Sequence, residues 1–248
     1  MIRAYFLSDL HLRDIEESNS QKLLLFLHGL ENKIYPGTHL FLVGDIFDLW
    51  IGDHRYFIEK FLKIVNAIKA VVAQGLDVHY FEGNHDLYLK NFWQQEVGVK
   101  VHEGPVYFSL GTLKVRVEHG DFMNPEDKGY LFLRRFLRSM PVKALAQNLP
   151  GPSVSWIGER MSHASRQHTS GRKKLRDEKI KEFMHTYAKQ AVEQQPFDYL
   201  ITGHTHVHDI YEFASNGEQV FSINLGSWFE LQKVLMLDPE LGYQFIEL

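Results

Sequence analysis

The sequence contains no cysteine, which excludes disulfide bonds and thiolate metal sites. It has no run of about eighteen apolar residues, so we expect no membrane-spanning helix. The start, MIRAYFLSDLHL, lacks the basic and apolar regions of a secretion signal, and we therefore expect a cytoplasmic protein. Excess positive charge is also missing. The formal net charge of −4 argues against a general nucleic-acid-binding protein.

The remaining composition is that of a globular chain able to bind metals. Its 248 residues are 44% hydrophobic, enough for a substantial core. We find no internal repeat, low-complexity segment or linker, and we predict a single domain, residues 1–248, with one large insertion. Fourteen histidines are present. Without cysteine, the plausible metal ligands are His, Asp, Glu and Asn.

Ligand-type side chains follow several apolar strand patterns. The segment GDIFDLWIGD, from Gly44 to Asp53, follows the apolar run His39–Val43 and places Asp45 just after a strand. Open α/β sheets usually carry their chemistry at that carboxyl edge. Four other predicted strands end in the same way: Ile2–Ser8 before Asp9 and His11, Val78–Phe81 before Asn84, Leu113–Glu118 before His119, and Tyr199–Thr202 before His204 and His206. This repetition predicts a centre of two divalent metal ions, with Asp45 between them.

Two of these motifs contain ligands two residues apart. If the extended conformation persists across Leu10, Asp9 and His11 point to the same side and form a chelating pair. His204 and His206 have the same spacing, and we expect one of them at each metal. Carboxylate, amide and imidazole groups suit Mn²⁺, Fe²⁺ or Zn²⁺. We favour Mn²⁺, and Fe²⁺ and Zn²⁺ stay open.

The remaining pattern predicts helices and further strands. We expect helices at 21–29, 56–74 and 177–194, and strands at 99–101, 106–110, 219–225, 233–237 and 243–247. Between Met140 and Gly158, Pro141, Pro150 and Pro152 are predicted to interrupt any helix.

The predicted centre suits phosphate esters. Two dications and two carboxylates leave a net charge of about +2, and two such ions can activate water and brace the attacking and leaving oxygens. His85, next to the ligand Asn84, is the candidate donor to the phosphoryl oxygen or leaving group. Asp86 and Asp121 are predicted to orient ligand imidazoles. Asp48 is either an outer partner or a helix cap.

The motifs DxH, GDxxD, GNH[DE], His-Gly and GHxH, in this order, resemble those of the calcineurin-like metallophosphoesterases. The resemblance implies a four-layer α-β-β-α sandwich, an α/β fold, with a dinuclear site. Carried over by position, it implies two ligand sets that share Asp45: Asp9, His11, Asp45 and His206 for the first metal, and Asp45, Asn84, His119 and His204 for the second.

A narrower resemblance covers nearly the whole chain. DLWIGD, HGDFMNPEDKGYLFLRRF, RMSHASRQHTSGRKK and LGSW resemble segments of the UDP-2,3-diacylglucosamine hydrolases, pyrophosphatases of lipid A synthesis that release UMP and lipid X. This resemblance implies a helical lid, residues 122–196, over an acyl-chain pocket. The residues implied in substrate binding are Trp50 at the active-site edge, Asp127 and Tyr130 at the glucosamine phosphate, and Ser165, Thr169 and Arg172 at the entrance. The chain departs from these enzymes in GNHD, where they usually carry arginine in place of His85, and at Ser162.

The predicted insertion combines apolar and basic residues. Its apolar stripe is Tyr130, Leu133, Phe136, Leu137 and Met140, and Arg134, Arg135 and Arg138 lie on other faces. Such a segment suits a nucleotide-linked lipid substrate and peripheral docking on the inner membrane, or a helical hairpin packed on the core with solvated charges. A general phosphatase or phosphodiesterase, which His85 favours, and a non-catalytic scaffold are the alternative functions. Neither the acyl-chain length nor the oligomeric state follows from the sequence.

Overall fold

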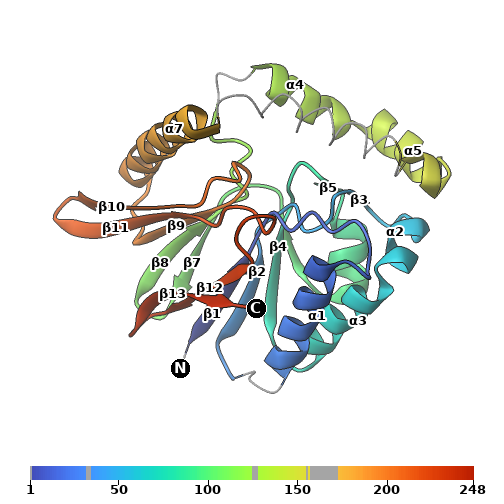
Figure 1. Cartoon of the computed structure of the whole chain (residues 1–248), viewed down its shortest axis with the longest axis horizontal. Coiled ribbons are helices and arrows are strands. Elements are labelled where there is room, and N and C mark those ends of the chain that lie inside the picture. Colours follow the sequence, from blue (N-terminus) through green and yellow to red (C-terminus); the bar gives the residue numbers. More distant parts are fainter. Residues whose placement is uncertain (1, 32–34, 125–127, 155, 157–172) are drawn as a thin grey trace.

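A computed structural model of the chain describes residues 2–31, 35–124, 128–154, 156 and 173–248. Two β-sheets lie face to face, and helices cover the outer side of each (Figure 1). This is the predicted four-layer α-β-β-α sandwich. Within the described residues, every helix is too short or too polar to cross a bilayer.

The first sheet has six strands and contains three of the motif-bearing strands. Its order is β13 (Gly242–Glu247), β12 (Lys233–Asp238), β1 (Arg3–Leu7), β2 (Thr38–Leu42), β4 (Asp77–Phe81) and β6 (Lys100–His102). Strands β1, β2, β4 and β6 run parallel, and β12 and β13 run antiparallel to their neighbours. The carboxyl ends of β1, β2 and β4 therefore share one edge.

The second sheet has five strands and carries the other two motifs. Its order is β10 (Asp209–Ser215), β11 (Glu218–Asn224), β9 (Tyr199–Thr202), β8 (Leu113–Val117) and β7 (Val106–Leu110). Strands β8 and β9 are parallel. Alternate residues of both sheets form the core between them, with Phe6, Phe41 and Phe81 from one and Val115, Val117 and Ile201 from the other.

The helices of the first outer layer cover the opposite face of the six-stranded sheet. Leucines of α1 (Ser18–Glu31) and the apolar face of α3 (Leu62–Ala73) pack against Leu7, Leu42 and Tyr80. The helix predicted at 56–74 is two helices, because Phe61, whose φ is −111°, separates α2 (Arg55–Lys60) from α3. The buried Phe61 ring packs on Phe47 with ring centroids 4.6 Å apart. The residue between the two helices is thus held in the core.

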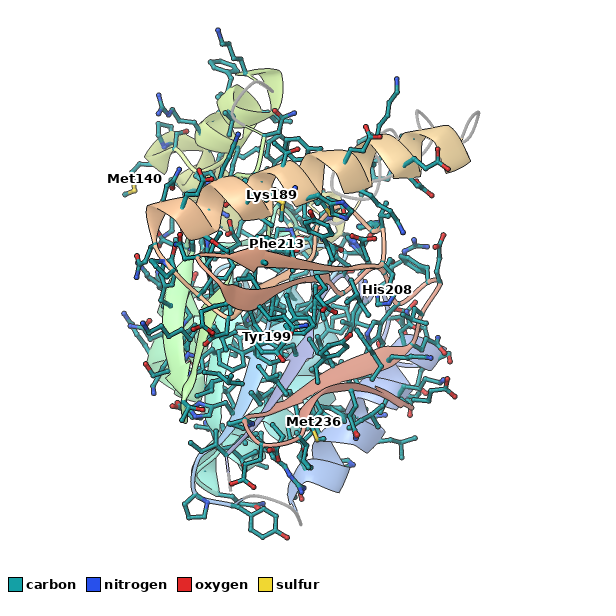
Figure 2. All side chains as sticks on the ribbon, turned by 90° about the vertical axis from the view of Figure 1, so that its left-hand side faces the viewer. Met140, Lys189, Tyr199, His208, Phe213 and Met236 are labelled. Carbon is teal, nitrogen blue, oxygen red and sulfur yellow. The ribbon has the colours of Figure 1, made fainter. Side chains whose placement is uncertain are left out.

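The described residues of the expected insertion include three helices, of which one packs on the five-stranded sheet and two lie apart from both sheets. Helix α7 (Lys173–Gln194) packs Ala188, Ala191 and Val192 on the five-stranded sheet and forms the fourth layer. Figure 2 shows this stack from the α7 side, with Lys189 above Phe213 of β10 and Tyr199 below them. Helices α4 (Lys128–Leu137) and α5 (Met140–Asn148) lie apart from the two sheets (Figure 1).

The proline prediction for Met140 to Gly158 is wrong for Pro141. This residue lies in the first turn of α5, where a missing backbone N–H removes no helical hydrogen bond. The sequence also gave no indication of β10 or of the π-helix η1 (Lys90–Val97). Two further short strands, β3 (Trp50–Ile51) and β5 (Asp86–Leu87), pair in parallel and join the loops after β2 and β4.

Candidate metal centre

The carboxyl edges of the two sheets meet, and all seven predicted ligands lie where they meet: Asp9, His11, Asp45, Asn84, His119, His204 and His206. A hydrogen bond crosses between the sheets at this point, since the His204 N–H donates to Asp9 Oδ2 at 3.0 Å. Within the five-stranded sheet, the Gly203 N–H donates to the His119 carbonyl oxygen at 3.0 Å and joins the loops after β9 and β8. Segments as much as 195 residues apart are thus held in contact.

The first ligand group consists of Asp9, His11 and His206. The distance from His206 Nε2 to Asp9 Oδ1 is 3.2 Å, and His11 Nε2 lies 3.0 Å from His206 Nε2 and 3.9 Å from Asp9 Oδ1. One carboxylate oxygen and two imidazole nitrogens therefore face a common point, with the spacing expected of ligands around one cation.

The second group consists of Asp45, Asn84, His119 and His204. Asn84 Oδ1 lies 3.0 Å from His204 Nδ1 and 3.4 Å from His119 Nε2. Nδ1 of His119 lies 2.8 Å from the Val43 carbonyl oxygen. A proton on Nδ1 would satisfy that oxygen and leave Nε2 as the electron-pair donor.

Asp45 lies between the two groups. Its Oδ2 is 4.0 Å from His11 Nε2 and 3.5 Å from His119 Nε2. The other oxygen, Oδ1, accepts the His85 N–H at 2.9 Å, which fixes the carboxylate. Asp45 therefore lies within 4.0 Å of an imidazole nitrogen of each group, and its bridging role stays a prediction.

The ligand loops adopt a backbone conformation that side-chain-bearing residues rarely use. Seven non-glycine residues of the described chain have positive φ, and five are predicted ligands: Asp9 (54°), His11 (48°), Asp45 (53°), His204 (69°) and His206 (59°). The predicted extended conformation through Leu10 is therefore wrong, although the pair still converges. Left-handed backbone at non-glycine residues is strained, and such strain concentrates at functional sites.

Two glycines allow the loops to approach the carboxylates. A Cβ on Gly83 would lie 2.1 Å from Asp45 Oδ1, and one on Gly203 would lie 2.3 Å from Asp9 Oδ2. Neither position has room for a side chain, so the glycines of GNHD and GHTH are required for the close approach.

The charges of the site fit bound cations. Asp9 Oδ1 and His11 Nδ1 are buried without a hydrogen-bond partner in the described structure. Burial lowers the pKa of His11 and of His204 to about 4, which keeps both rings neutral as ligands must be. Burial opposes charge on Asp45, but the nearby His119 and His85 hold the pKa of its carboxyl well below the usual value. Burial opposes protonation of His119 as well, but the Asp45 carboxylate raises the pKa of this ring to about 10. A bound cation would take the place of that proton, and carboxylates with imidazoles are a donor set that suits a divalent cation.

His85 lies beside the first ligand group. Its ring centroid is 4.8 Å from that of His11, and its Nδ1 lies 2.7 Å from the Asp48 carbonyl oxygen. That contact calls for a proton on Nδ1, which leaves Nε2 of the neutral ring as an acceptor. To give a proton to a leaving group, the His85 ring would have to carry protons on both nitrogens, as the singly charged imidazolium.

Asp86 and Asp121 were predicted to orient ligand imidazoles, but their hydrogen bonds are to other groups. Asp86 accepts hydrogen bonds from the Ile46 and Phe47 N–H groups and from Tyr80 OH, at 2.8, 3.3 and 2.9 Å. It thus holds the loop after Asp45. Asp121 accepts from Arg134 Nε at 2.6 Å and from Tyr130 OH at 3.2 Å, and so connects the loop after His119 to α4.

Among the predicted substrate residues, Trp50 requires correction. Its side chain is fully buried against Phe47, Phe57 and Trp93, and its Nε1 donates to the Gly52 carbonyl oxygen at 2.8 Å. Trp50 is therefore a core residue and cannot contact substrate. The Tyr130 ring lies 5.7 Å from that of His204. The remaining predicted substrate residues lie outside the described residues: Asp127, Ser165, Thr169 and Arg172.

Arg134 of α4 and Arg138, the residue directly after this helix, form contacts that we did not predict. Arg138 pairs with the buried Glu82 and donates to the Gly83 carbonyl oxygen at 3.0 Å. Arg134 pairs with Asp121 as described above. The two arginines are four residues apart, a spacing present in the sequence, and the Arg138 N–H donates to the Arg134 carbonyl oxygen at 3.1 Å. They attach α4 to the loops that carry Asn84 and His119.

A match to a protein-family model defines the class of this protein. The family model of the calcineurin-like phosphoesterases matches residues 2–208, and the chain belongs to this family. It is a metal-dependent hydrolase of phosphoester bonds.

Similar curated proteins carry a more specific name. UDP-2,3-diacylglucosamine hydrolase of Haemophilus influenzae is 27% identical over 248 residues, with 100% of both chains covered. The enzymes of that name from Klebsiella pneumoniae and Escherichia coli are 26% and 29% identical, with 95% of this chain and 95% and 96% of theirs covered. A solved archaeal phosphodiesterase, 14% identical with 100% of both chains covered, has the same fold at a TM-score of 0.51.

Proposed function

We propose that the protein cleaves the pyrophosphate bond of UDP-2,3-diacylglucosamine and releases UMP and the acylated glucosamine phosphate known as lipid X. The observation that carries the proposal is the full-length similarity to enzymes of that name, together with the seven converging ligands. Two bound Mn²⁺ ions would supply positive charge for the phosphate oxygens and activate the attacking water.

The protein's own residues have separate roles in this proposal. His85, as the imidazolium, donates a proton to the leaving phosphate, and its Nδ1 contact with Asp48 sets the ring orientation. Asn84 contributes an amide oxygen to the metal site, and His85 is the next residue in the chain. Replacing His85 by alanine should reduce kcat by about 10²–10⁴, while replacement by arginine, the residue usual in the lipid enzymes, should retain more activity on the lipid substrate.

The region 122–196 is proposed as the lid that binds the acyl chains. Several large apolar side chains of α4 and α5 are exposed: Phe132, Leu133, Phe136, Met140 and Leu145. Exposed apolar groups on helices attached to the metal loops suit an amphiphilic substrate and peripheral contact with a membrane surface.

The test is hydrolysis of two substrates by the Mn²⁺-loaded protein. UDP-2,3-diacylglucosamine should yield UMP, and bis(p-nitrophenyl) phosphate reports whether the metal centre is active. Cleavage of the chromogenic diester without release of UMP from the lipid would reject the lipid proposal. Leu133→Ser and Phe136→Ser should raise KM for the lipid and leave hydrolysis of the small diester unchanged. Equal effects on both substrates would reject the acyl-binding role.

A second candidate function is hydrolysis of a soluble phosphoester. His85 favours it, because the general phosphoesterase pattern has histidine at this position and the lipid enzymes usually have arginine. A panel of nucleotides and phosphopeptides would identify this activity, which should then be insensitive to Leu133→Ser. Vesicle sedimentation tests the membrane contact separately, since binding to anionic vesicles should fall in Phe132→Ser.

A further inference from the structure

A second group of ligand-type side chains lies outside the metal centre. His39 is the second residue of β2, and Asp77 and His79 lie on the neighbouring strand β4. His39 pairs with Asp77 in the register of the two strands. Residues two apart on a strand face the same side, so all three point toward the five-stranded sheet, as Phe41 and Phe81 do. His39 and Asp77 lie at the amino ends of their strands, away from the edge that carries Asp45 and Asn84.

The ligand atoms of this group have the spacing of a cation site. The distance from Asp77 Oδ2 is 3.5 Å to His39 Nδ1 and 3.6 Å to His79 Nε2, which is too long for good hydrogen bonds. Around a tetrahedral Zn²⁺ with ligand bonds near 2.0–2.1 Å, neighbouring ligand atoms lie about 3.3 Å apart. The same kind of spacing, 3.2 and 3.5 Å, separates imidazole and carboxylate atoms in the metal centre.

Two buried ring nitrogens of the group have no hydrogen-bond partner in the described structure. They are His39 Nδ1 and His79 Nε2, and His79 as a whole is 4% exposed. The other His79 nitrogen, Nδ1, lies 3.0 Å from His102 Nε2, a contact that orients the ring with Nε2 toward Asp77. Burial lowers the pKa of both histidines, which keeps the rings neutral and able to coordinate.

We propose that His39, Asp77 and His79 bind one Zn²⁺ ion, separate from the dinuclear centre. Two imidazoles and one carboxylate are a common zinc donor set. The side chains of His39 and Asp77 are 20% and 34% exposed, so solvent has access and water can fill the fourth position. The ion would join β2 to β4 and stabilise the folded chain by binding it in preference to the unfolded chain.

Lys100 competes with the proposed ion. Its Nζ lies 2.6 Å from Asp77 Oδ1 and 2.8 Å from Oδ2. Its side chain is 58% exposed, so it can leave Oδ2 when a cation binds. Lys100→Gln removes a positive charge beside the site and should tighten Zn²⁺ binding, on the order of tenfold.

The test counts zinc equivalents in the full-length protein. After chelator treatment and dialysis, Zn²⁺ is titrated by calorimetry into wild type, His39→Ala and the control His28→Ala, whose imidazole is exposed on α1. Wild type and His28→Ala should bind one equivalent more than His39→Ala. His39→Ala should keep its Mn²⁺-dependent activity, which shows that the dinuclear centre is intact.

Equal numbers of bound zinc ions in wild type and His39→Ala would overturn the proposal. If His39→Ala does not fold, Lys100→Gln decides. A lower Kd for one zinc equivalent supports the site, and an unchanged or higher Kd overturns it. If wild type and all variants lack phosphoesterase activity, the result counts against the dinuclear centre. The difference in bound zinc between wild type and His39→Ala still tests the separate zinc site.

Discussion

Replacing Gly203 by alanine tests whether close packing between loops positions the metal ligands. The new Cβ would lie 2.3 Å from Asp9 Oδ2 and 2.6 Å from Ser8 Oγ. Gly203 does not have positive φ, so alanine can adopt its backbone conformation. The expected effect therefore comes from overlap with Asp9 and Ser8 alone.

The size of the effect follows from these distances. Ordinary contact begins at 3.4 Å, so the Asp9 carboxylate must retreat by about 1 Å. Asp9 Oδ2 also accepts the His204 N–H at 3.0 Å, and this second ligand is displaced with it. A misplacement of about 1 Å in a reacting group costs roughly 10²-fold in rate. We expect kcat/KM to fall about 100-fold, equivalent to ~2.7 kcal/mol of transition-state stabilisation.

The assay is Mn²⁺-dependent hydrolysis of bis(p-nitrophenyl) phosphate, with metal affinity measured by calorimetry. Gly104→Ala is the matched control, because no atom lies within 4 Å of a Cβ at that glycine. It should behave as wild type. Unchanged activity and unchanged metal affinity in Gly203→Ala would refute the reasoning.

Three further predictions concern stability and metal removal. Trp50→Ala should lower the free energy of unfolding by about 3–5 kcal/mol because the side chain is fully buried. A loss of unfolding free energy below about 1 kcal/mol, measured by urea denaturation, would contradict its role in the core. Chelation should abolish activity and lower Tm, and Mn²⁺ should restore both; retained activity after complete metal removal would contradict metal dependence. Burial lowers the pKa of His79 to about 3, so the folded chain binds fewer protons than the unfolded chain between that value and about 6.5. His79 should therefore contribute a fall of about 2 kcal/mol in the stability of the metal-free protein from pH 6.5 to 5. His79→Gln should remove that contribution, and an identical pH dependence in this variant would exclude His79 as its source.

The positions of the metal ligands could be predicted because strand and motif are adjacent in the sequence. Asp45, Asn84 and His119 each follow an apolar run by a few residues, and parallel strands bring their carboxyl ends to one edge. The approach of two sheets was implied by the family resemblance and is confirmed by the structure. Periodicity within each strand gives no information on which sheet it joins.

The details of the loops could not be predicted from residue spacing. Asp9 and His11 converge through left-handed backbone, although the i,i+2 spacing indicated an extended segment. Trp50 was placed at the active-site edge by the family resemblance, but its burial depends on the aromatic cluster formed with distant residues such as Trp93. In the same way, Asp86 binds backbone N–H groups 39 and 40 residues away, a contact that only the folded chain reveals.

The effect of a proline on a helix depends on the turn in which it lies. Pro141 was interpreted as a helix breaker, yet in the first turn of α5 it is compatible with the helix. The basic residues Arg134 and Arg138 were predicted to lie off the apolar stripe, with no partner named. They pair with Asp121 and Glu82, so they hold α4 beside the metal loops.

The most direct test of the central claim is anomalous diffraction from crystals of the protein grown with Mn²⁺. We predict two manganese peaks, one beside Asp9, His11 and His206 and one beside Asn84, His119 and His204, both within coordination distance of Asp45. A single peak at this edge of the sheets, or peaks only elsewhere in the molecule, would contradict the dinuclear centre.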